Sequence, residues 1–261
     1  MVKHLLTIGG SDTWGGGGIQ TDLKTFENLQ VFGLSALTCL AFDKEQKFFI
    51  ETFDAALVEA QLQTIERSFQ LDGVKIGLLG SLETIQVVRA FCERNQGKFP
   101  IVLDPVMAFK ESEQQAMHDY IEQIKTLIPF ATVVTPNLAE MHLFMPQTSI
   151  QTVEEMKQVS QKFVTTFQSA VYLKGGRHLD EQAAIDLYCD TQQLQIFEGP
   201  ISQKKTIHGA GCCLSSAIAS HLALGLPILE SLSTSKRFVY EAIEQGLPLG
   251  DAGNVWHPIN H

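Results

Sequence analysis

Short apolar runs alternate along the chain with longer segments in which apolar residues recur every three or four positions. Six runs have the length of a buried strand: Leu5–Ile8, Ser35–Phe42, Val74–Leu79, Ile101–Val106, Thr132–Val134 and Val171–Lys174. Two segments between them have the spacing of a helix face, formed by Phe53, Leu57, Ala60, Ile65 and Phe69 and by Ile85, Val88, Ala90 and Phe91. Continuous apolar strands separated by helices are typical of a parallel sheet covered on both faces.

The pattern changes in the last third of the chain. Two short runs, Ala184–Tyr188 and Leu194–Phe197, flank the turn sequence Cys189-Asp-Thr-Gln, which predicts a hairpin and therefore an antiparallel edge. Two helices follow, one beginning at Gly209 and one after Pro227. No linker, charge block or internal repeat divides the chain. The sequence therefore predicts one α/β domain over residues 1–261. It has a three-layer αβα architecture, in which helices cover both faces of a central, mostly parallel, twisted sheet with antiparallel edge strands.

Composition argues against two classes of partner. Acidic residues outnumber basic ones by 29 to 19, and the net charge is −10. Nucleic acids and anionic membranes attract basic surfaces, so neither is an expected partner. The most apolar run, Val31–Phe42, is too short to span a bilayer, and the N-terminal residues lack the apolar region of a signal peptide. Five irregularly spaced cysteines are typical of reduced thiols, which predicts a cytoplasmic location.

Ligands of such sheets bind at the carboxyl ends of the strands, and the first of these segments is rich in glycine. Gly9–Gly18 contains six glycines in ten residues and leads into a helical segment, whose N-terminus favours an anion or a polar ring. The glycines are contiguous and no Gly-Lys-Ser/Thr follows, so neither a Walker A loop nor a dinucleotide fingerprint is present. Asp12 fits a helix cap and a substrate hydrogen bond equally well.

Three further segments place ionisable side chains after strands. Asp104 closes a buried strand, where a carboxylate needs a lysine or a hydrated cation unless it only forms a turn before Pro105. Asn137 and Glu140 are three apart, which fits a helix cap and also a carboxylate that holds hydrated Mg²⁺ near phosphates. Lys174 precedes two glycines, which suits a lysine on a phosphate as well as an ordinary turn.

The stretch TIHGAGCC (206–213) is expected to begin a helix at Gly209. Its free N–H groups and the helix dipole favour an anion, and the same field is expected to lower the pKa of Cys212. Cys213 fits a small packed apolar residue. His208 and Cys212 lack the second Cys/His pair of a zinc site, and a bridge between adjacent cysteines would strain the helix. A cysteine hydrolase stays open, because its His base could come from elsewhere.

Six segments, in order and spacing, together resemble the ribokinase-like small-molecule kinases. They read LTIGGSDTWGGGGIQTDLKTF, VKIGLLGS, VLDPVM, VVTPNLAE, YLKGG and HGAGC. They are similar to the branch that holds hydroxymethylpyrimidine (phosphate) kinases and bacterial pyridoxal kinases, and the resemblance covers nearly the whole chain. It implies a ribokinase-like fold and in-line transfer of the ATP γ-phosphoryl group to a CH₂OH group on a heteroaromatic ring.

The resemblance also implies roles for individual residues. The catalytic group comprises Cys212 as the base and the anion hole of Gly209, Ala210 and Gly211. The ATP site comprises Lys174, Gly176, Asn137 and Glu140. Mg²⁺ is positioned by Asp104 and Glu140. The substrate ring is surrounded by Asp12, Gly16, Gly18, Asp43, Val106, Met107 and His208. A homodimer is implied by the relatives, and the need for a monovalent cation stays open.

Departures from the pyrimidine kinases favour a vitamin B6 substrate. The segment after Met107 reads AFKESEQQ, which is unlike the Ser-Gly segment of many pyrimidine kinases. Phe109 stands near the position where some pyridoxal kinases have an aldehyde-trapping cysteine, so covalent trapping of pyridoxal is not expected. Asp43 stands where a pyrimidine kinase usually has Gln or Glu. The ending LPLGDAGNVWHP resembles the pyridoxal kinases. We therefore expect phosphorylation of pyridoxal, pyridoxine or pyridoxamine. Hydroxymethylpyrimidine kinase or dual activity is the alternative, and a cysteine hydrolase or a silent ligand-binding regulator are the non-kinase readings.

Overall fold

The structure, a computed structural model, describes residues 2–45, 47–107, 114–146, 148–249 and 253–258. Its strands are β1 (His4–Asp12), β2 (Phe32–Lys44), β3 (Lys47–Thr52), β4 (Gly73–Ile76), β5 (Ile101–Leu103), β6 (Val133–Val134), β7 (Val171–Gly176), β8 (Ala184–Cys189) and β9 (Leu194–Gly199). Its helices are α1 (Gly18–Asn28), α2 (Ala55–Ser68), α3 (Leu82–Arg94), α4 (Gln114–Lys125), α5 (Leu138–Phe144), α6 (Val153–Phe167), α7 (Ala210–Ala223) and α8 (Ile228–Glu244).

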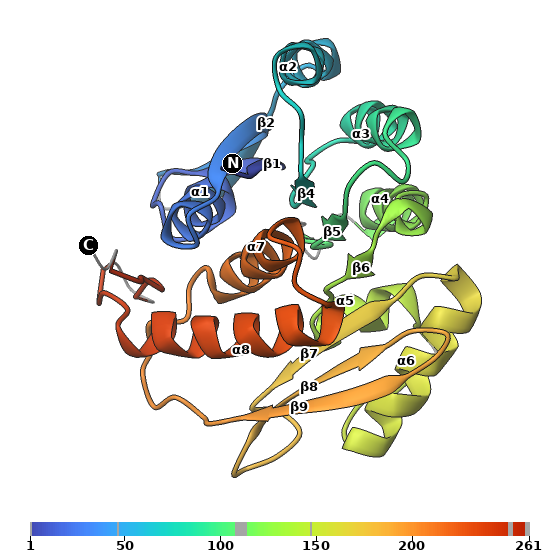
Figure 1. Ribbon diagram of the computed structural model, residues 1–261, viewed down its shortest axis with the longest axis vertical. Coiled ribbons are helices and arrows are strands. Elements are labelled where there is room, and N and C mark those ends of the chain that lie inside the picture. Colours follow the sequence, from blue (N-terminus) through green and yellow to red (C-terminus); the bar gives the residue numbers. More distant parts are fainter. Residues whose placement is uncertain (1, 46, 108–113, 147, 250–252, 259–261) are drawn as a thin grey trace.

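The described strands form one sheet in the order β3-β2-β1-β4-β5-β6-β7-β8-β9 (Figure 1). The strands from β2 to β7 in this order run parallel, whereas β3, β8 and β9 pair antiparallel at the two edges. The predicted mostly parallel sheet and the predicted β8–β9 hairpin are thereby confirmed. Strand β3 was not predicted. Its sequence KFFIET holds the apolar run Phe48–Ile50, but this run is only three residues long and lies largely exposed at the edge of the sheet.

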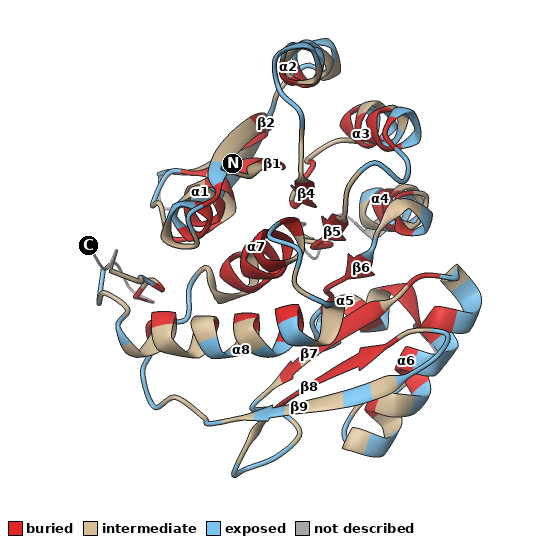
Figure 2. Cartoon of the chain, in the orientation of Figure 1, coloured by how far each residue is buried: buried red, intermediate tan, exposed pale blue. Residues whose placement is uncertain are grey.

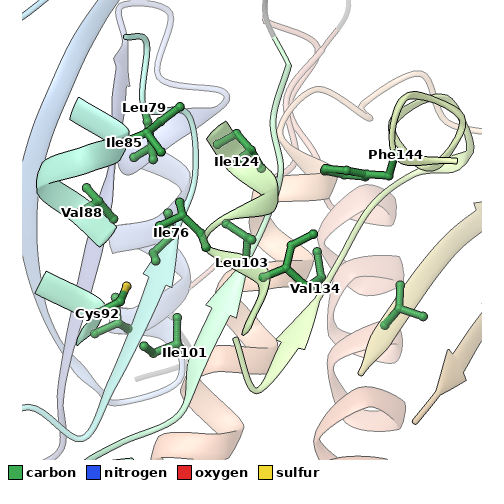
Figure 3. Close-up of a cluster of buried hydrophobic side chains, with 14 of the residues drawn as sticks. Ile76, Leu79, Ile85, Val88, Cys92, Ile101, Leu103, Ile124, Val134 and Phe144 are labelled. Carbon is green, nitrogen blue, oxygen red and sulfur yellow. The ribbon is translucent and has the colours of Figure 1, made fainter. Parts of the chain in front are cut away.

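Helices cover both faces of the sheet and bury a separate apolar cluster on each. Helices α2 to α6 contribute to one cluster, and α1, α7 and α8 contribute to the other. Buried residues line the sheet-facing sides of these helices (Figure 2). Figure 3 shows part of the first cluster, where Ile76, Leu103 and Val134 of neighbouring strands lie beside side chains of α3 and α4. None of the described helices combines the length and apolar character needed to cross a membrane.

The predicted helix between Phe53 and Phe69 is present, and its buried face agrees with the predicted one only in part. Val58 and Leu62 are fully buried and Ile65 nearly so, whereas Leu57 is 53% exposed. Phe69 lies beyond the end of α2 and stacks on Phe32 outside the core. Ile65 belongs to the predicted face and is buried as expected, and Phe53 is half-buried against the same cluster. Val58 and Leu62 enter the core in place of Leu57 and Ala60.

Candidate active site

The carboxyl ends of β1, β5 and β7 lie at one edge of the parallel part of the sheet, and α7 begins beside them. Asp12 ends β1, Asp104 directly follows β5, and Lys174 lies near the end of β7. This is the edge at which open parallel sheets bind ligands. The predicted site segments, far apart in the sequence, therefore reach one region of the molecule.

Asp12 organises the glycine loop that follows β1. Its Oδ2 accepts a hydrogen bond from the N–H of Gly17 at 2.6 Å, and its Oδ1 accepts one from Trp14 at 3.0 Å. His208 Nε2 lies 3.0 Å from the same Oδ2 atom. Asp12 therefore caps its own loop and joins that loop to the residue just before α7.

Two close backbone contacts require glycine here: the loop before α7 meets the loop before α1 at Gly209, and the start of α1 meets β1 at Gly18. Gly209 has φ +84°, and a Cβ there would overlap the carbonyl oxygen of Gly16. Gly18 has φ +56°, and its Cβ would overlap the carbonyl oxygen of Gly10. Both φ values favour glycine because other L-residues are strained there. Several of the glycines that predicted a ligand loop thus also allow backbone to pack on backbone.

Asp104 finds the lysine partner that its burial required. It is 1% exposed, and its Oδ1 accepts from Lys174 Nζ at 2.9 Å. Its Oδ2 accepts from Ser215 Oγ of α7 at 2.9 Å, and Thr135 Oγ1 lies 3.4 Å from Oδ1. Both oxygens are therefore engaged by protein donors. The pair holds the ammonium group of Lys174 at the start of α7, where a Cβ on Gly211 would lie 3.6 Å from Nζ.

Glu140 is a second carboxylate near Lys174, with its Oε2 4.0 Å from Nζ. The predicted cap is present: Asn137 Oδ1 accepts from the N–H of Glu140, and Glu140 Oε2 accepts from the N–H of Asn137, both at 2.8 Å. Burial, only partly offset by Lys174 and reinforced by the charge of Asp104, raises the pKa of Glu140 to about 7. Its Oε1 accepts no hydrogen bond from the part of the chain that the structure describes, so it is available to a cation.

Cys212 lies in the first turn of α7, as predicted, but the expected lowering of its pKa is wrong. Burial of the thiol raises the pKa of Cys212 to about 11. The positive charge of Lys75 and the backbone N–H of Gly18 favour the thiolate, but they do not offset desolvation and the charges of Asp22 and Asp104. Cys213 is buried and accepts from Thr25 Oγ1 at 3.6 Å, which agrees with the predicted packing role.

A buried ion pair beneath Cys212 was not predicted. Lys75 Nζ lies 2.9 Å from both carboxylate oxygens of Asp22, and the two side chains are 1% and 0% exposed. Thr7 and Ser216 also donate to Asp22, at 2.6 and 2.7 Å. Two signals could have pointed to this pair: Lys75 interrupts an apolar strand, and Asp22 follows a glycine loop within an amphipathic helix.

The remaining predicted residues lie at or around this edge. Ala210 and Gly211 form the first turn of α7, and Gly176 ends β7 with φ +57°. Val106 and Met107 are half-buried just beyond Asp104. Asp43 is exposed near the turn of the β2–β3 hairpin, where it pairs with Phe48. Within the described part of the chain, its side chain makes no hydrogen bond or ion pair with another predicted site residue. Phe109 and residues 108–113 of the AFKESEQQ segment lie outside the described residues.

The C-terminal segment also reaches the site, which the sequence did not reveal. The N–H of Val255 donates to the carbonyl oxygen of His208 at 3.0 Å, and the N–H of His208 donates to that of Gly253 at 3.2 Å. A Cβ on Gly16 would overlap the side chains of Asn254 and His208. Residues 253–255 therefore brace both loops that meet at Gly209.

Comparisons with known proteins point to one enzyme family. The family described as phosphomethylpyrimidine kinase matches residues 12–257. The pyridoxine kinase of Bacillus subtilis is 33% identical over 252 residues, covering 95% of this chain and 93% of the relative. The hydroxymethylpyrimidine/phosphomethylpyrimidine kinase of Rhizobium meliloti is 36% identical over 263 residues, covering 100% and 97%.

Solved structures agree with these relatives. The ADP complex of Bacillus subtilis pyridoxal kinase has a TM-score of 0.92 at 30% identity, covering 99% of this chain and 98% of that chain. The Staphylococcus aureus pyridoxal kinase in complex with AMP-PCP has a TM-score of 0.90 at 34% identity, covering 99% and 95%. The ribokinase-like fold implied by the sequence motifs is confirmed.

Proposed function

Because the chain belongs to the phosphomethylpyrimidine kinase family, we propose that it phosphorylates the hydroxymethyl group of pyridoxal, pyridoxine or pyridoxamine to the 5′-phosphate, with ATP as the donor. It is a phosphotransferase that acts on an alcohol. The observation that carries the proposal is the cluster of Lys174, Asp104 and Glu140 beside the free N-terminus of α7, with Cys212 in its first turn. Relatives that bind ADP, AMP-PCP and pyridoxal support the choice of donor and acceptor.

Phosphoryl transfer depends mainly on positioning and on neutralising charge around the transferring group. The N–H groups of the first turn of α7 and the ammonium of Lys174 supply positive potential at one place. Gly209 and Gly211 let the phosphoryl oxygens approach these N–H groups. Asp104 acts on the reaction by fixing Lys174, since both of its oxygens are already engaged.

Cys212 is the proposed base for the hydroxyl proton. Only the thiolate form of Cys212 accepts a proton. Because its pKa is about 11, the side chain is mainly in the thiol form at neutral pH. Lys75 beneath it favours the thiolate form. The raised pKa also weighs against the hydrolase reading, because reactive nucleophilic cysteines have lowered pKa values.

The donor set fits a hydrated Mg²⁺ at Glu140 better than at Asp104. The described residues contain no group of three His, Cys, Asp or Glu side chains that would bind a metal directly. Glu140 has a free oxygen and a pKa raised by burial, so a nearby cation would stabilise its charged form. A cation held there would supply positive charge that offsets the charge of the phosphates. Asn137 keeps Glu140 in place through the helix cap.

The acceptor ring is assigned to the space around Asp12, His208 and the glycine loop. A substrate panel tests this assignment: pyridoxal, pyridoxine, pyridoxamine and hydroxymethylpyrimidine are each supplied with ATP and Mg²⁺, and kcat/KM is compared. We expect the B6 vitamers to be preferred. A preference for hydroxymethylpyrimidine of tenfold or more, about 1.4 kcal/mol, would assign the chain to the alternative function. The relative from Rhizobium meliloti is the observation that favours this alternative.

The predicted homodimer and cytoplasmic location remain proposals. The five cysteines are all free in the structure, which is compatible with a reducing compartment. Sedimentation of the purified chain measures its oligomeric state. Activity assays in the absence of K⁺ and Na⁺, and after addition of each, measure whether a monovalent cation is required.

A further inference from the structure

A buried carboxylate behind Lys174 holds the turn that follows this lysine. Asp186 of β8 is 6% exposed, and its Oδ1 accepts from the N–H groups of Gly175 at 3.0 Å and Gly176 at 3.2 Å. A Cβ on Gly175 would overlap the carbonyl oxygen of Ile185. The backbone directly after Lys174 is therefore fixed by Asp186 and has no room for a larger residue.

The second oxygen of Asp186 is held by two other side chains. Tyr172 of β7 donates its hydroxyl to Oδ2 at 3.1 Å, and Lys236 of α8 donates to it at 2.6 Å. A Cβ on Gly199 would lie 3.0 Å from Cε of Lys236, so the lysine stem crosses β9 where there is no side chain. Each carboxylate oxygen of Asp186 therefore accepts two hydrogen bonds from the protein, so neither is left for a ligand. Its influence on a ligand must therefore pass through the turn.

We propose that Asp186 is a positioning residue of the nucleotide site: it orients the Gly175–Gly176 turn, and through it Lys174, toward the phosphates of ATP. This inference rests on the proposed kinase function, which assigns the turn to ATP. The acceptor ring is assigned to Asp12 and His208 on other loops. Loss of Asp186 is therefore expected to affect the nucleotide and to spare the acceptor.

The same strand offers a matched control at its other end. Asp190 follows β8, and its Oδ1 accepts from the N–H groups of Gln192 at 2.7 Å and Gln193 at 2.8 Å. Its Oδ2 accepts from the hydroxyl of Tyr188 at 2.8 Å. Asp190 thus holds a two-residue turn and a tyrosine as Asp186 does, but its turn joins β8 to β9, away from Lys174.

The experiment compares Asp186→Ala and Asp190→Ala in the full chain. KM is measured for ATP and for pyridoxal, ADP binding is measured by calorimetry, and Tm is measured for both variants. We expect Asp186→Ala to raise the KM for ATP at least tenfold, about 1.4 kcal/mol, and to change the KM for pyridoxal less than twofold. Asp190→Ala is expected to lower Tm while both KM values stay within twofold. Asp186→Asn keeps an oxygen for the two N–H groups and is expected to restore part of the ATP affinity.

The positioning role would be overturned if Asp186→Ala and Asp190→Ala changed the KM for ATP equally. It would also be overturned if Asp186→Ala changed the KM for ATP and the KM for pyridoxal in parallel. If Asp186→Ala does not fold, Asp186→Asn and Asp190→Asn give the same comparison: a rise in the KM for ATP confined to the first supports the role, and equal values overturn it. A wild-type chain that neither binds ADP nor turns over ATP overturns the proposed function as well. Wild-type ADP binding with unchanged binding in Asp186→Ala overturns the positioning role alone.

Discussion

Replacing Gly209 by alanine tests whether the first turn of α7 forms the anion hole. Its φ of +84° is in the left-handed region, which costs an L-residue about 1–2 kcal/mol. The new methyl group would in addition overlap the carbonyl oxygen of Gly16, so one of the two loops must move. A displacement of about 1 Å at a reacting group costs roughly 100-fold in rate. We therefore expect kcat to fall at least about 100-fold, beyond any loss of stability.

The other end of α7 provides the control for backbone strain. Gly225 has φ +91°, and a Cβ there would meet no atom within 4 Å. Gly225→Ala should share the strain of about 1–2 kcal/mol, which corresponds to a fall in Tm of roughly 2–8 °C. Its kcat should stay close to that of the wild type. The assay is ADP release at saturating ATP and pyridoxal, with Tm measured in parallel. Turnover by Gly209→Ala within threefold of that by Gly225→Ala would refute the reasoning.

Three further changes probe the charges of the site. Cys212→Ala removes the proposed base and should therefore lower kcat by about 100-fold or more. ADP affinity, measured by calorimetry, should change little. Wild-type turnover in this variant would exclude Cys212 as the base. The pKa of Glu140 is raised from 4.5 to about 7 in the folded chain, so the folded state holds a proton that the unfolded state has lost, and stability should fall as pH rises between these values. In Glu140→Gln, Tm measured across this range should fall less, and an equally steep fall would contradict the shifted pKa. Lys75→Met leaves Asp22 buried without a cation and should lower the free energy of unfolding, measured in urea, by about 3–5 kcal/mol. The double variant Lys75→Met/Asp22→Leu should recover part of this loss. A loss below about 1 kcal/mol in Lys75→Met alone would show that the charge of Asp22 is compensated in another way.

Apolar periodicity predicted the part of the fold in which burial is strongest. The central strands are buried on both faces, so their runs are visible in the sequence without knowledge of their neighbours. Strand β3 lies at the edge of the sheet and is mostly exposed, and its apolar run Phe48–Ile50 is too short to indicate a strand without knowledge of its neighbour β2. Helix α2 was predicted, but its buried face only in part: Ile65 is buried as predicted, whereas Val58 is buried in place of its neighbour Leu57. Only the position of the sheet decides between them.

The candidate site was predicted in its parts but not in its electrostatics. Asp104 was expected to need a lysine or a cation, and Lys174 provides the lysine. The pKa of Cys212 was predicted in the wrong direction because the helix dipole is visible in the sequence whereas desolvation depends on packing. The Lys75–Asp22 pair joins residues that are 53 positions apart, and no local pattern reports such a contact.

The contact between residues 253–255 and His208 has a consequence for the timing of synthesis. The loop at Gly16 leaves the ribosome before most of the sheet is made, whereas its brace at Asn254 follows only after α8 has been made. A nascent chain that has completed the whole sheet therefore still has an unbraced loop next to Gly209. Catalytic competence is expected to arrive only when residues 253–255 pair with His208, and a chain cut after α8 is expected to keep its sheet while losing turnover.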